Sequence, residues 1–594
     1  MKNKLIIKFM FLGIFILAAG LRFYNLNWDQ GFHLHPDERA IVMFTLPLQF
    51  PSTIQQFLSV SSPWNPHFFA YGSLPLYLLK LTGIVVGHFN MLLTEYDGIN
   101  LVGRVISGLF DLGTLACVFL LGKKLKNSMV GLTAAFFYAI SVLSIQLSHF
   151  YAVDTILTFF LTLILYALII FYERPNFIKA AFIGILLGFA FATKISATVI
   201  LISLATALIA DFGLLILKHP LHPQRWVTHV PRFLLSLAIS LCAIAIAALV
   251  IYTILEPYAF LDFPEFWQQT LAQSQMTRDA FTFPYTLQYV GIIPYWYELK
   301  NIFLWGLGPL LAIISFLGII YGTIIATTKY VRQEKWAQEL ILMSFFWAYF
   351  LTVGKFAIGF MRYMLPLYPL FCLFGAIFIF RLIEQITSFL LHRHRINNSL
   401  LLIICYTLLA IGLLVWPLSF MHIYSQPNTR VLASNYINQT IPAGKTLAVE
   451  HWDDGLPLVT QSNYSIETLA LYDQDTPEKW STIVEQLQQA DYIIIASNRL
   501  YVPIQKLADC NKYPQPHCYP IGSVYYKNLF SGKPILQNTQ FSSLPGASQL
   551  VFKQVAQFSI YPEIPILNIP INDQKADESF TVYDHPKIMI FKKQ

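Results

Sequence analysis

The stretch HLHPDERA, residues 33–40, follows the first apolar segment of the chain and carries two adjacent carboxylates, Asp37 and Glu38. Pro36 favours an extended or turn-like conformation at His35 and can start a short helix at the carboxylates. Either carboxylate can accept a proton from a hydroxyl group that is brought to it. The alternative is that both are solvated charges in the first turn of a helix, where acidic residues are common. The segments around this stretch decide between the two interpretations.

The composition of the 594-residue chain is that of an integral membrane protein. Hydrophobic residues make up 56% of it and charged residues only 12%, and the mean hydropathy is +0.55. Soluble domains carry about 25% charged residues, so we expect most of this chain to lie in lipid. The net charge of +7 requires no nucleic-acid partner, because positive loops on the cytoplasmic side of a membrane account for it.

Apolar stretches long enough to cross a bilayer recur through the first 424 residues. We expect about eleven transmembrane helices, near residues 5–23, 100–122, 128–147, 155–172, 177–193, 195–217, 233–255, 301–326, 337–353, 363–382 and 399–420. Alternate loops are basic, which places the N-terminus in the cytoplasm and the C-terminal tail outside, in a multi-pass protein of the plasma (inner) membrane. The first segment, with Ala18-Ala19-Gly20 at its end, is also compatible with a cleaved signal peptide. Both interpretations place residue 37 outside.

Two long loops are expected on the outer side of the transmembrane domain, which covers residues 1–424. They cover residues 24–99 and 256–300. Within the first loop, the stretch 71–87 is apolar but carries Lys80 and prolines near its start. We therefore expect a helix that lies in the membrane interface and does not cross the bilayer.

The tail, residues 425–594, is more polar and is expected to contain no further span. Its apolar runs predict strands at 446–450, 491–497 and 587–591, with a helix at 477–489. Alternating strands and helices indicate a small extracytoplasmic α/β domain. The sequence WDDG at 452–455 is either a turn or a contact for an acceptor or metal. Cys510 and Cys518 can form a disulfide if this tail faces an oxidising compartment.

Two charged residues lie inside the second predicted span. Arg104 and Asp111 are seven residues apart and therefore share one face of a helix. Ionisable residues within a membrane usually face the protein interior or a water-filled cavity. Two roles are open: a structural Arg104–Asp111 pair, and a contact between Arg104 and a phosphate group. The run HRHR at 392–395 lies on an expected cytoplasmic turn and is interpreted as a topology signal, not as a metal site.

The distribution of polar residues favours an enzyme over a transporter or flippase. Transporters usually place polar sites near the membrane midplane, often in repeated halves. Here no repeat is visible, and isolated polar residues lie at the outer ends of the predicted helices, namely His149, Asp154, Lys194, Glu256 and Arg362. The cytoplasmic loops are also too short for a nucleotide-binding domain, so a transferase with this layout would receive its donor from the lipid.

With these residues assembled, the chain resembles the lipid-carrier-dependent glycosyltransferases of the C-type superfold. It is similar to the protein mannosyltransferases that use dolichyl-phosphate-mannose and to the bacterial aminoarabinose transferases, and most similar to a prokaryotic branch of the former. The motifs that carry the resemblance are HPDE at 35–38, YGSLPLY at 71–77, GRVISGLF at 103–110, SHFYAVDTILTFF at 148–160, ATKIS at 192–196, RYMLPLYP at 362–369, EHWDDGLP at 450–457, DYIIIASNRLY at 491–501 and TVYDHPKIMIF at 581–591.

The resemblance implies transfer of a hexose or pentose from a polyprenyl phosphate to an acceptor hydroxyl on the outer face, with inversion. By position, Asp37 resembles the catalytic base, and Glu38 and Asp154 are the acidic residues expected beside it. The phosphate of the donor is expected to contact Arg104, Lys194 and Arg362. The expected substrate-binding residues are His35, Tyr71, His149 and Glu256.

The expected partners are the polyprenyl-phosphate sugar donor, membrane lipids and an acceptor that is a protein, a lipid or a glycan. No cofactor is expected to be required and no metal ligands are assigned. Asp37, Glu38 and Asp154 could form an oxygen-ligand site for a divalent metal, although the resemblance does not indicate one. The alternative function is transport or flipping of a lipid-linked sugar.

Overall fold

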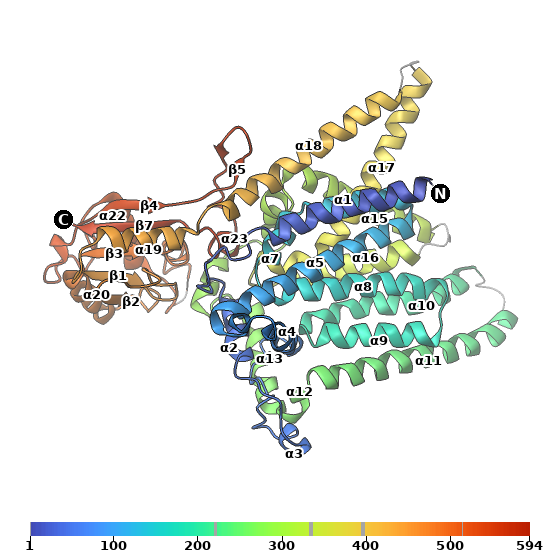
Figure 1. The fold of residues 1–594 in the computed structure, drawn as a ribbon, viewed down its shortest axis with the longest axis horizontal. Helices are drawn as coiled ribbons and strands as arrows, with labels where there is room; N and C mark the ends of the chain where they lie inside the picture. The colour runs from blue at the N-terminus through green and yellow to red at the C-terminus, as the bar shows by residue number, and fades with distance from the viewer. Residues whose placement is uncertain (1, 219–222, 332–336, 394–397, 514) are drawn as a thin grey trace.

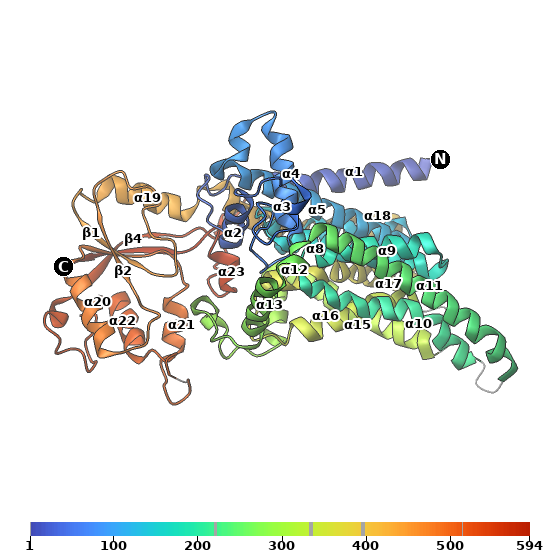
Figure 2. The same cartoon turned by 90° about the horizontal axis from the view of Figure 1, so that it is seen from below.

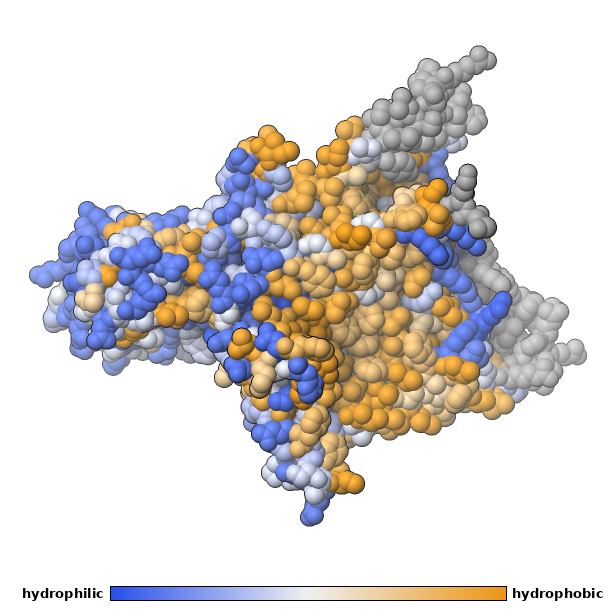
Figure 3. All heavy atoms as spheres, viewed as in Figure 1, coloured by the Kyte–Doolittle hydropathy of each residue, from blue (hydrophilic) through white to orange (hydrophobic). Residues whose placement is uncertain are grey.

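The computed structural model describes residues 2–218, 223–331, 337–393, 398–513 and 515–594. A bundle of long helices forms one end of the molecule and a sheet-containing unit (residues 429–593) forms the other (Figures 1 and 2). The surface of the bundle is mainly apolar and that of the sheet-containing unit mainly hydrophilic (Figure 3). The predicted fold class, a polytopic helical protein with a C-terminal α/β unit, is confirmed.

Within the described residues, seven helices are long and apolar enough to cross a membrane, or eight if one bent pair counts as a single span. These seven candidate spans correspond to α1 (Lys2–Phe23), α5 (Tyr96–Leu125), α8 (Val153–Glu173), α11 (Pro223–Leu255), α15 (Pro309–Val331), α17 (Tyr368–Arg393) and α18 (Asn398–Ser425). Shorter apolar helices occupy three more predicted spans, as α9 (Phe177–Phe191), α10 (Leu201–Lys218) and α16 (Ala337–Val353). Each of the eleven predicted segments therefore contains a helix. The last two residues of the HRHR run, 394 and 395, lie outside the described residues.

The predicted span 128–147 is bent. It consists of α6 (Ser128–Ala139) and α7 (Val142–Ser148), which meet at an angle of 60°. The carbonyls of Tyr138 and Ala139, at the end of α6, accept hydrogen bonds from the guanidinium of Arg22 at 3.2 and 2.8 Å. Arg22 also pairs with Asp111. A buried cation thus supplies donors to carbonyls at the helix end, where intrahelical partners are missing.

The first long loop carries three short helices at the end of the bundle that faces the sheet. They are α2 (Pro36–Thr45), α3 (Ile54–Phe57) and α4 (Leu74–Gly87). The predicted helix in the stretch 71–87 is thus present as α4, and Lys80 donates to the carbonyl of Leu46 at 2.9 Å. The second long loop carries α12 (Tyr258–Leu261), α13 (Phe263–Arg278), the 3₁₀ helix η3 (Pro284–Tyr289) and α14 (Trp296–Asn301).

The sheet-containing unit has five strands in the order β2-β1-β3-β7-β4. These are β1 (Thr446–Glu450), β2 (Ser465–Leu469), β3 (Tyr492–Ile495), β4 (Phe552–Phe558) and β7 (Ile588–Lys593). β1 pairs in parallel with β2 and β3, whereas β7 is antiparallel to β3 and β4. The predicted strands and the helix α20 (Pro477–Gln489) are present, and Cys510 is bonded to Cys518.

Alternation along the strands explains why helices cover both faces of this sheet. Leu447 and Ile494 pack with residues of α19 (Thr429–Thr440) on one face. Ala448 and Ile493, their neighbours in sequence, pack with Trp480 of α20 and with residues of α22 (Pro520–Ser531) on the other. Successive side chains of a strand point to opposite faces, so both sets are apolar.

A segment before β7 reaches back from the sheet to the bundle. It runs from residue 573 to residue 585 and contains the short helix α23 (Glu578–Thr581). Phe580 is part of the same apolar core as the membrane helices. Asp584 accepts hydrogen bonds from Gln146 at 3.0 Å and from Tyr424 at 2.8 Å. This segment therefore brings C-terminal side chains to the end of the bundle.

Candidate functional site

A cavity of about 1120 Å³ lies where the end of the bundle meets the sheet-containing unit. Its wall is formed by the start of α2, the residues before α4, the turn after α9, the end of α13 and the segment between α16 and α17. The end of α16 and the 3₁₀ helix η3 also contribute, and the sheet-containing unit with the segment 573–585 supplies Trp452, Arg499, Glu578 and Tyr583. Of the predicted site residues, Asp37, Tyr71, Lys194 and Arg362 line this cavity.

Asp37 lies in the first turn of α2 and faces the cavity. The N-terminus of α2 is set by His35, whose Nδ1 accepts from the backbone N–H of Glu38, and by Pro36 at the first helical position. The carboxylate pairs with Arg362, and 21% of its side chain remains exposed. Burial alone would raise the pKa of Asp37. The charge of Arg362, the hydrogen bond from Tyr71 and the charge of Lys194 outweigh it, so the pKa lies below the usual range.

Two cations and two carboxylates alternate beside the cavity. Arg362 lies between Asp37 and Asp154, with 3.8 Å between its Nε and Oδ2 of Asp154. Lys194 Nζ contacts Oδ1 of Asp154 at 2.9 Å and lies 4.5 Å from the ring centre of Tyr363. Both cations line the cavity, whereas Asp154, at the start of α8, is 3% exposed and lies behind them. The arrangement holds two cations and one carboxylate at the cavity surface.

Arg104 lies outside this cavity in a fully buried cluster with Asp29 and Glu38. Its Nε and one Nη2–H donate to Glu38, the other Nη2–H and one Nη1–H donate to Asp29, and the last Nη1–H donates to the carbonyl of Leu26. A guanidinium has five N–H donors, so none is left for a phosphate. The predicted contact between Arg104 and the donor phosphate is therefore not supported. The other role left open, an Arg104–Asp111 pair, is contradicted, because Asp111 pairs with Arg22.

Glu38 supports the backbone beside the cavity. In addition to Arg104, its carboxylate accepts the backbone N–H of Tyr151 at 2.8 Å. Glu38 is completely buried and does not line the cavity. It is therefore placed to position the start of α2, whereas its neighbour Asp37 meets the cavity.

Three predicted substrate-binding residues do not line the cavity. His35 is 1% exposed, and its ring lies between Phe150 and Tyr583; burial lowers the pKa of His35 to about 3. His149 stacks on Tyr424 with ring centres 3.8 Å apart. Glu256 accepts hydrogen bonds from the backbone and hydroxyl of Ser73, just before α4. In each case the buried polar group is used by neighbouring protein groups.

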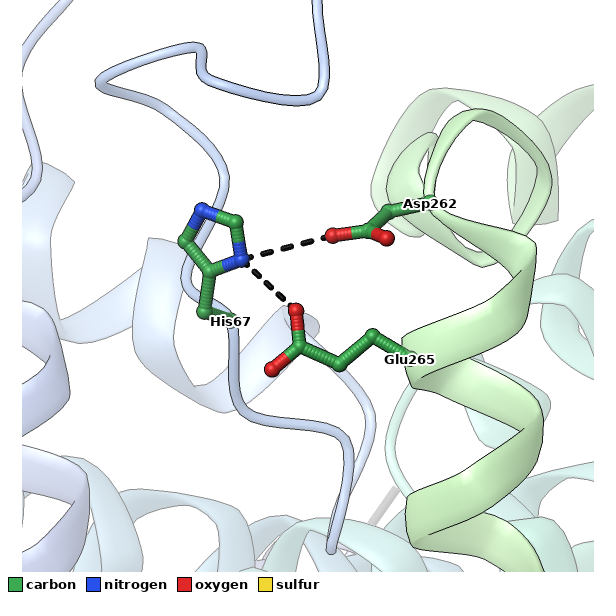
Figure 4. A group of neighbouring side chains, drawn as sticks. All are labelled: His67, Asp262 and Glu265. Atoms are coloured by element: carbon green, nitrogen blue, oxygen red, sulfur yellow. Dashed lines mark hydrogen bonds and ion pairs between the residues drawn. The ribbon is translucent and has the colours of Figure 1, made fainter.

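The three carboxylates considered as metal ligands do not converge on one point. Glu38 pairs with Arg104, Asp37 with Arg362, and Asp154 with Lys194 and, at 3.8 Å, Arg362. A separate group of ligand atoms, within 4.8 Å of one another, is formed by His67, Asp262 and Glu265, none of which lines the cavity (Figure 4). His67 Nδ1 lies 3.3 Å from Asp262 and 2.8 Å from Glu265, so these three side chains already contact one another.

Local sequence carries little signal for the cavity residues of the sheet-containing unit. Arg499 pairs with Glu578 at 2.7 Å and donates to the carbonyl of Trp452 at 3.2 Å. Tyr583 lies within TVYDHP, whose residues alone do not indicate a place in a cavity. In WDDG, Asp453 and Asp454 pair with Arg430 and Arg39, respectively, at 2.9 and 2.8 Å, beside a second cavity of about 300 Å³. A contact between the WDDG turn and the first long loop is therefore present.

Comparisons with known proteins agree with this architecture. Residues 99–251 match the model of a family described as dolichyl-phosphate-mannose-protein mannosyltransferase. No curated protein matches the chain by sequence.

Two solved structures with a similar fold are those of the archaeal oligosaccharyltransferase AglB from Archaeoglobus fulgidus and of an Archaeoglobus fulgidus oligosaccharyltransferase. The first, in complex with an inhibitory peptide and a dolichol-phosphate, has a TM-score of 0.51 and 12% identity, and the match covers 100% of this chain and 89% of that chain. The second, in the apo form, has a TM-score of 0.52 and 12% identity, and the match covers 99% and 88%. At this level of identity, the likeness concerns the fold.

Proposed function

We propose that this chain is a C-type glycosyltransferase that moves a sugar from a polyprenyl phosphate to an acceptor hydroxyl; the family match over residues 99–251 and the similar fold support this proposal. The observation that carries this proposal is the cavity, in which the carboxylate of Asp37 lies beside Lys194 and Arg362. A glycosyl phosphate needs a base for the attacking hydroxyl and positive charge for the leaving phosphate. Groups of both kinds line the cavity.

Asp37 is the general base of this reaction. Its low pKa keeps it ionised at neutral pH, so it can take the proton of the acceptor hydroxyl. The acceptor oxygen then forms a bond to C1 of the sugar as the bond from C1 to the phosphate oxygen breaks. The electron pair of the broken bond stays on the phosphate, and in-line attack inverts the configuration at C1.

Arg362 and Lys194 bind the donor phosphate. Guanidinium groups bind phosphate in a bidentate manner, and lysine binds it as a point charge. Arg362 pairs with Asp37, so a phosphate that takes over Arg362 also offsets the positive charge that acts most strongly on the base. Donor binding therefore raises the pKa of Asp37 and makes it a stronger base at the moment when it is needed.

The sheet-containing unit faces the donor across the cavity and is placed to receive the acceptor. Trp452 is 49% exposed and offers an aromatic surface, and Tyr583 and Arg499 lie on the same wall. Tyr71, on the bundle side, holds a hydroxyl that stays protonated, because burial first and then the charge of Asp37 raise its pKa well above the usual range. The acceptor hydroxyl is thus delivered between the two parts of the chain, toward Asp37.

The same proposal sets the location of the reaction. The basic loops of the sequence place the sheet-containing unit and both long loops outside a plasma (inner) membrane. The donor then arrives within the lipid, and the acceptor is a protein, lipid or glycan of the extracytoplasmic side. In this proposal neither deprotonation of the acceptor hydroxyl nor binding of the leaving phosphate needs a cofactor, since the base and the phosphate-binding cations belong to the chain itself.

Purified protein in lipid nanodiscs, supplied with a labelled polyprenyl-phosphate sugar, tests the proposal. Release of polyprenyl phosphate that depends on Asp37 supports a glycosyltransferase. In sealed vesicles, movement of the labelled lipid across the bilayer without cleavage of the sugar–phosphate bond would establish a flippase instead and overturn the proposal.

A further inference from the structure

A small hairpin projects from the protein beside the last turns of α18 (Figure 1). It is formed by β5 (Glu563–Ile564) and β6 (Ile569–Pro570), which pair antiparallel and are not part of the five-stranded sheet. In the chain it lies between β4 and the segment 573–585 that reaches the cavity. The position of this hairpin therefore bears on how the last part of the chain is held against the bundle.

The tip of the hairpin is apolar and open. Ile566 is 97% exposed, and Leu567 and Ile569 are 65% and 50% exposed. Residues 564–572, IPILNIPIN, contain no charged side chain. Ile566 also has a φ of +70°, which is unfavourable for a β-branched residue. A turn in water is normally built from Gly, Asn, Asp, Ser or Pro, so this turn presents isoleucine and leucine at a cost in backbone strain.

The base of the hairpin is fixed to the membrane bundle. Ile560 and Ile571, on either side of the hairpin, pack against the apolar core that contains the membrane helices. Glu563 at the start of β5 lies 3.7 Å from His422, which is in the last turn of α18. The hairpin is thus attached to the bundle at the last turn of α18, a helix that is apolar enough to cross a membrane.

An exposed apolar face of α18 leads to this level. Ile411, Val415 and Leu418 are exposed and lie on one face, at intervals of four and three residues. His422 follows four residues later on the same face and contacts the hairpin. In Figure 3 apolar atoms cap the projection, hydrophilic atoms lie directly below the cap, and the apolar surface of the bundle begins beside it. The lipid-facing side of α18 is therefore continuous with the hairpin.

We propose that the β5–β6 hairpin inserts its tip, Ile566 and Leu567, into the leaflet of the membrane that adjoins the sheet-containing unit. The occupant of this surface is the bilayer that the bundle itself crosses, because the hairpin is attached to α18 at the edge of the apolar belt. Glu563 and His422 then lie at the level of the headgroups, where a charged side chain remains solvated. The insertion fixes the chain just before the segment that carries Glu578 and Tyr583 into the cavity.

Depth measurements on the intact protein in nanodiscs of phosphatidylcholine and phosphatidylglycerol test this proposal. A nitroxide label is placed at Ile566→Cys in a variant that lacks Cys117, Cys242, Cys372 and Cys405. Val555→Cys serves as the matched control, because Val555 is a 44% exposed aliphatic residue on β4 of the sheet. We expect the label at 566 to collide with oxygen, which concentrates in the bilayer, and the label at 555 to collide with a water-soluble nickel complex.

Two outcomes would overturn the proposal. Equal exposure of both labels to the nickel complex would show that the hairpin lies in water. Protection of the label at 566 from both reagents would show that another protein surface covers the tip.

A second measurement concerns the role of the insertion. The double variant Ile566→Asp with Leu567→Asp should lower the unfolding temperature in nanodiscs, whereas Val555→Asp should not. An unchanged unfolding temperature for the double variant would contradict the proposed anchoring of the chain by lipid.

Discussion

Replacing Arg104 with methionine should unfold the end of the bundle without weakening the affinity of the folded protein for its donor. The change removes five hydrogen bonds, four of them to the carboxylates of Asp29 and Glu38. Glu38 keeps the backbone N–H of Tyr151, and Asp29 keeps those of Gly31 and Leu34. Two carboxylates would then remain buried without a cation.

The magnitude follows from this uncompensated charge. Removing one partner of a buried ion pair costs about 3 to 5 kcal/mol, which corresponds to roughly two to three and a half powers of ten in the unfolding equilibrium. The loss of stability arises because two carboxylates remain buried without a cation. Arg104→Met combined with Asp29→Asn and Glu38→Gln should therefore regain part of the lost free energy of unfolding. Non-additivity of this kind is expected for residues that share one network.

The assay has two readouts, measured in the same nanodiscs. Unfolding by heat or denaturant gives the loss of stability for the single and triple variants. Titration with a labelled polyprenyl phosphate, scaled to the folded fraction, gives the donor affinity. If Arg104→Met left stability unchanged and weakened donor binding tenfold or more, Arg104 would be the phosphate contact and the structural role argued here would be wrong.

Four further predictions follow from the site. Lys194→Ala and Arg362→Ala should each weaken donor binding about 10- to 100-fold, as expected for a lost charge-assisted hydrogen bond of about 1.5 to 3 kcal/mol; affinities equal to wild type would remove both from the phosphate site. Since Arg362 should depress the pKa of Asp37 most strongly before the donor phosphate binds, the acid limb of kcat/KM should lie at lower pH than that of kcat, and coincident limbs would contradict the exchange of partners. Chelation with EDTA should leave the transfer rate unchanged, because the carboxylates near the cavity are paired with Lys194, Arg362 and Arg104; loss of activity that is restored by a divalent cation would refute this. Burial opposes the charge on His585, but Asp584 and Asp573 raise its pKa to about 10. The stabilisation by this charged histidine should therefore be complete below the ordinary histidine pKa of about 6.5 and should be lost as the pH rises toward the folded value. A His585→Gln variant that is as stable as wild type at pH 6 would contradict this prediction.

The fold was predictable to the extent that local sequence determines it. Length and hydropathy located all eleven helical segments, because a membrane requires long apolar runs. Continuous apolar runs located β1, β3 and β7, because a sheet covered on both faces requires apolar residues at successive positions. The bend between α6 and α7 was not predictable, since its partner Arg22 lies more than a hundred residues earlier in the chain.

The site was predictable only in part, because local sequence does not determine contacts between residues that lie far apart in the chain. The position of Asp37 at the start of a helix was predictable, because Pro36 and the adjacent acidic pair mark a helix start just beyond a span. The partners of Arg104 were not predictable, because the choice between a phosphate and Asp29 depends on a contact between residues 75 positions apart. Glu578 and Tyr583 gave no local signal, since their place in the cavity depends on how the segment before β7 folds back to the bundle.

The most direct test of the account is the single-turnover rate of Asp37→Asn with donor bound. Asparagine keeps the shape of the side chain and removes the base, so transfer should slow by about 10² to 10⁴. Donor affinity should not fall, because Arg362 loses its partner and stays free for the phosphate. Glu38→Gln, which alters a residue outside the cavity, should slow transfer less in the folded protein. Transfer at the wild-type rate by Asp37→Asn would contradict the central claim, and loss of transfer only in Glu38→Gln would move the base to Glu38.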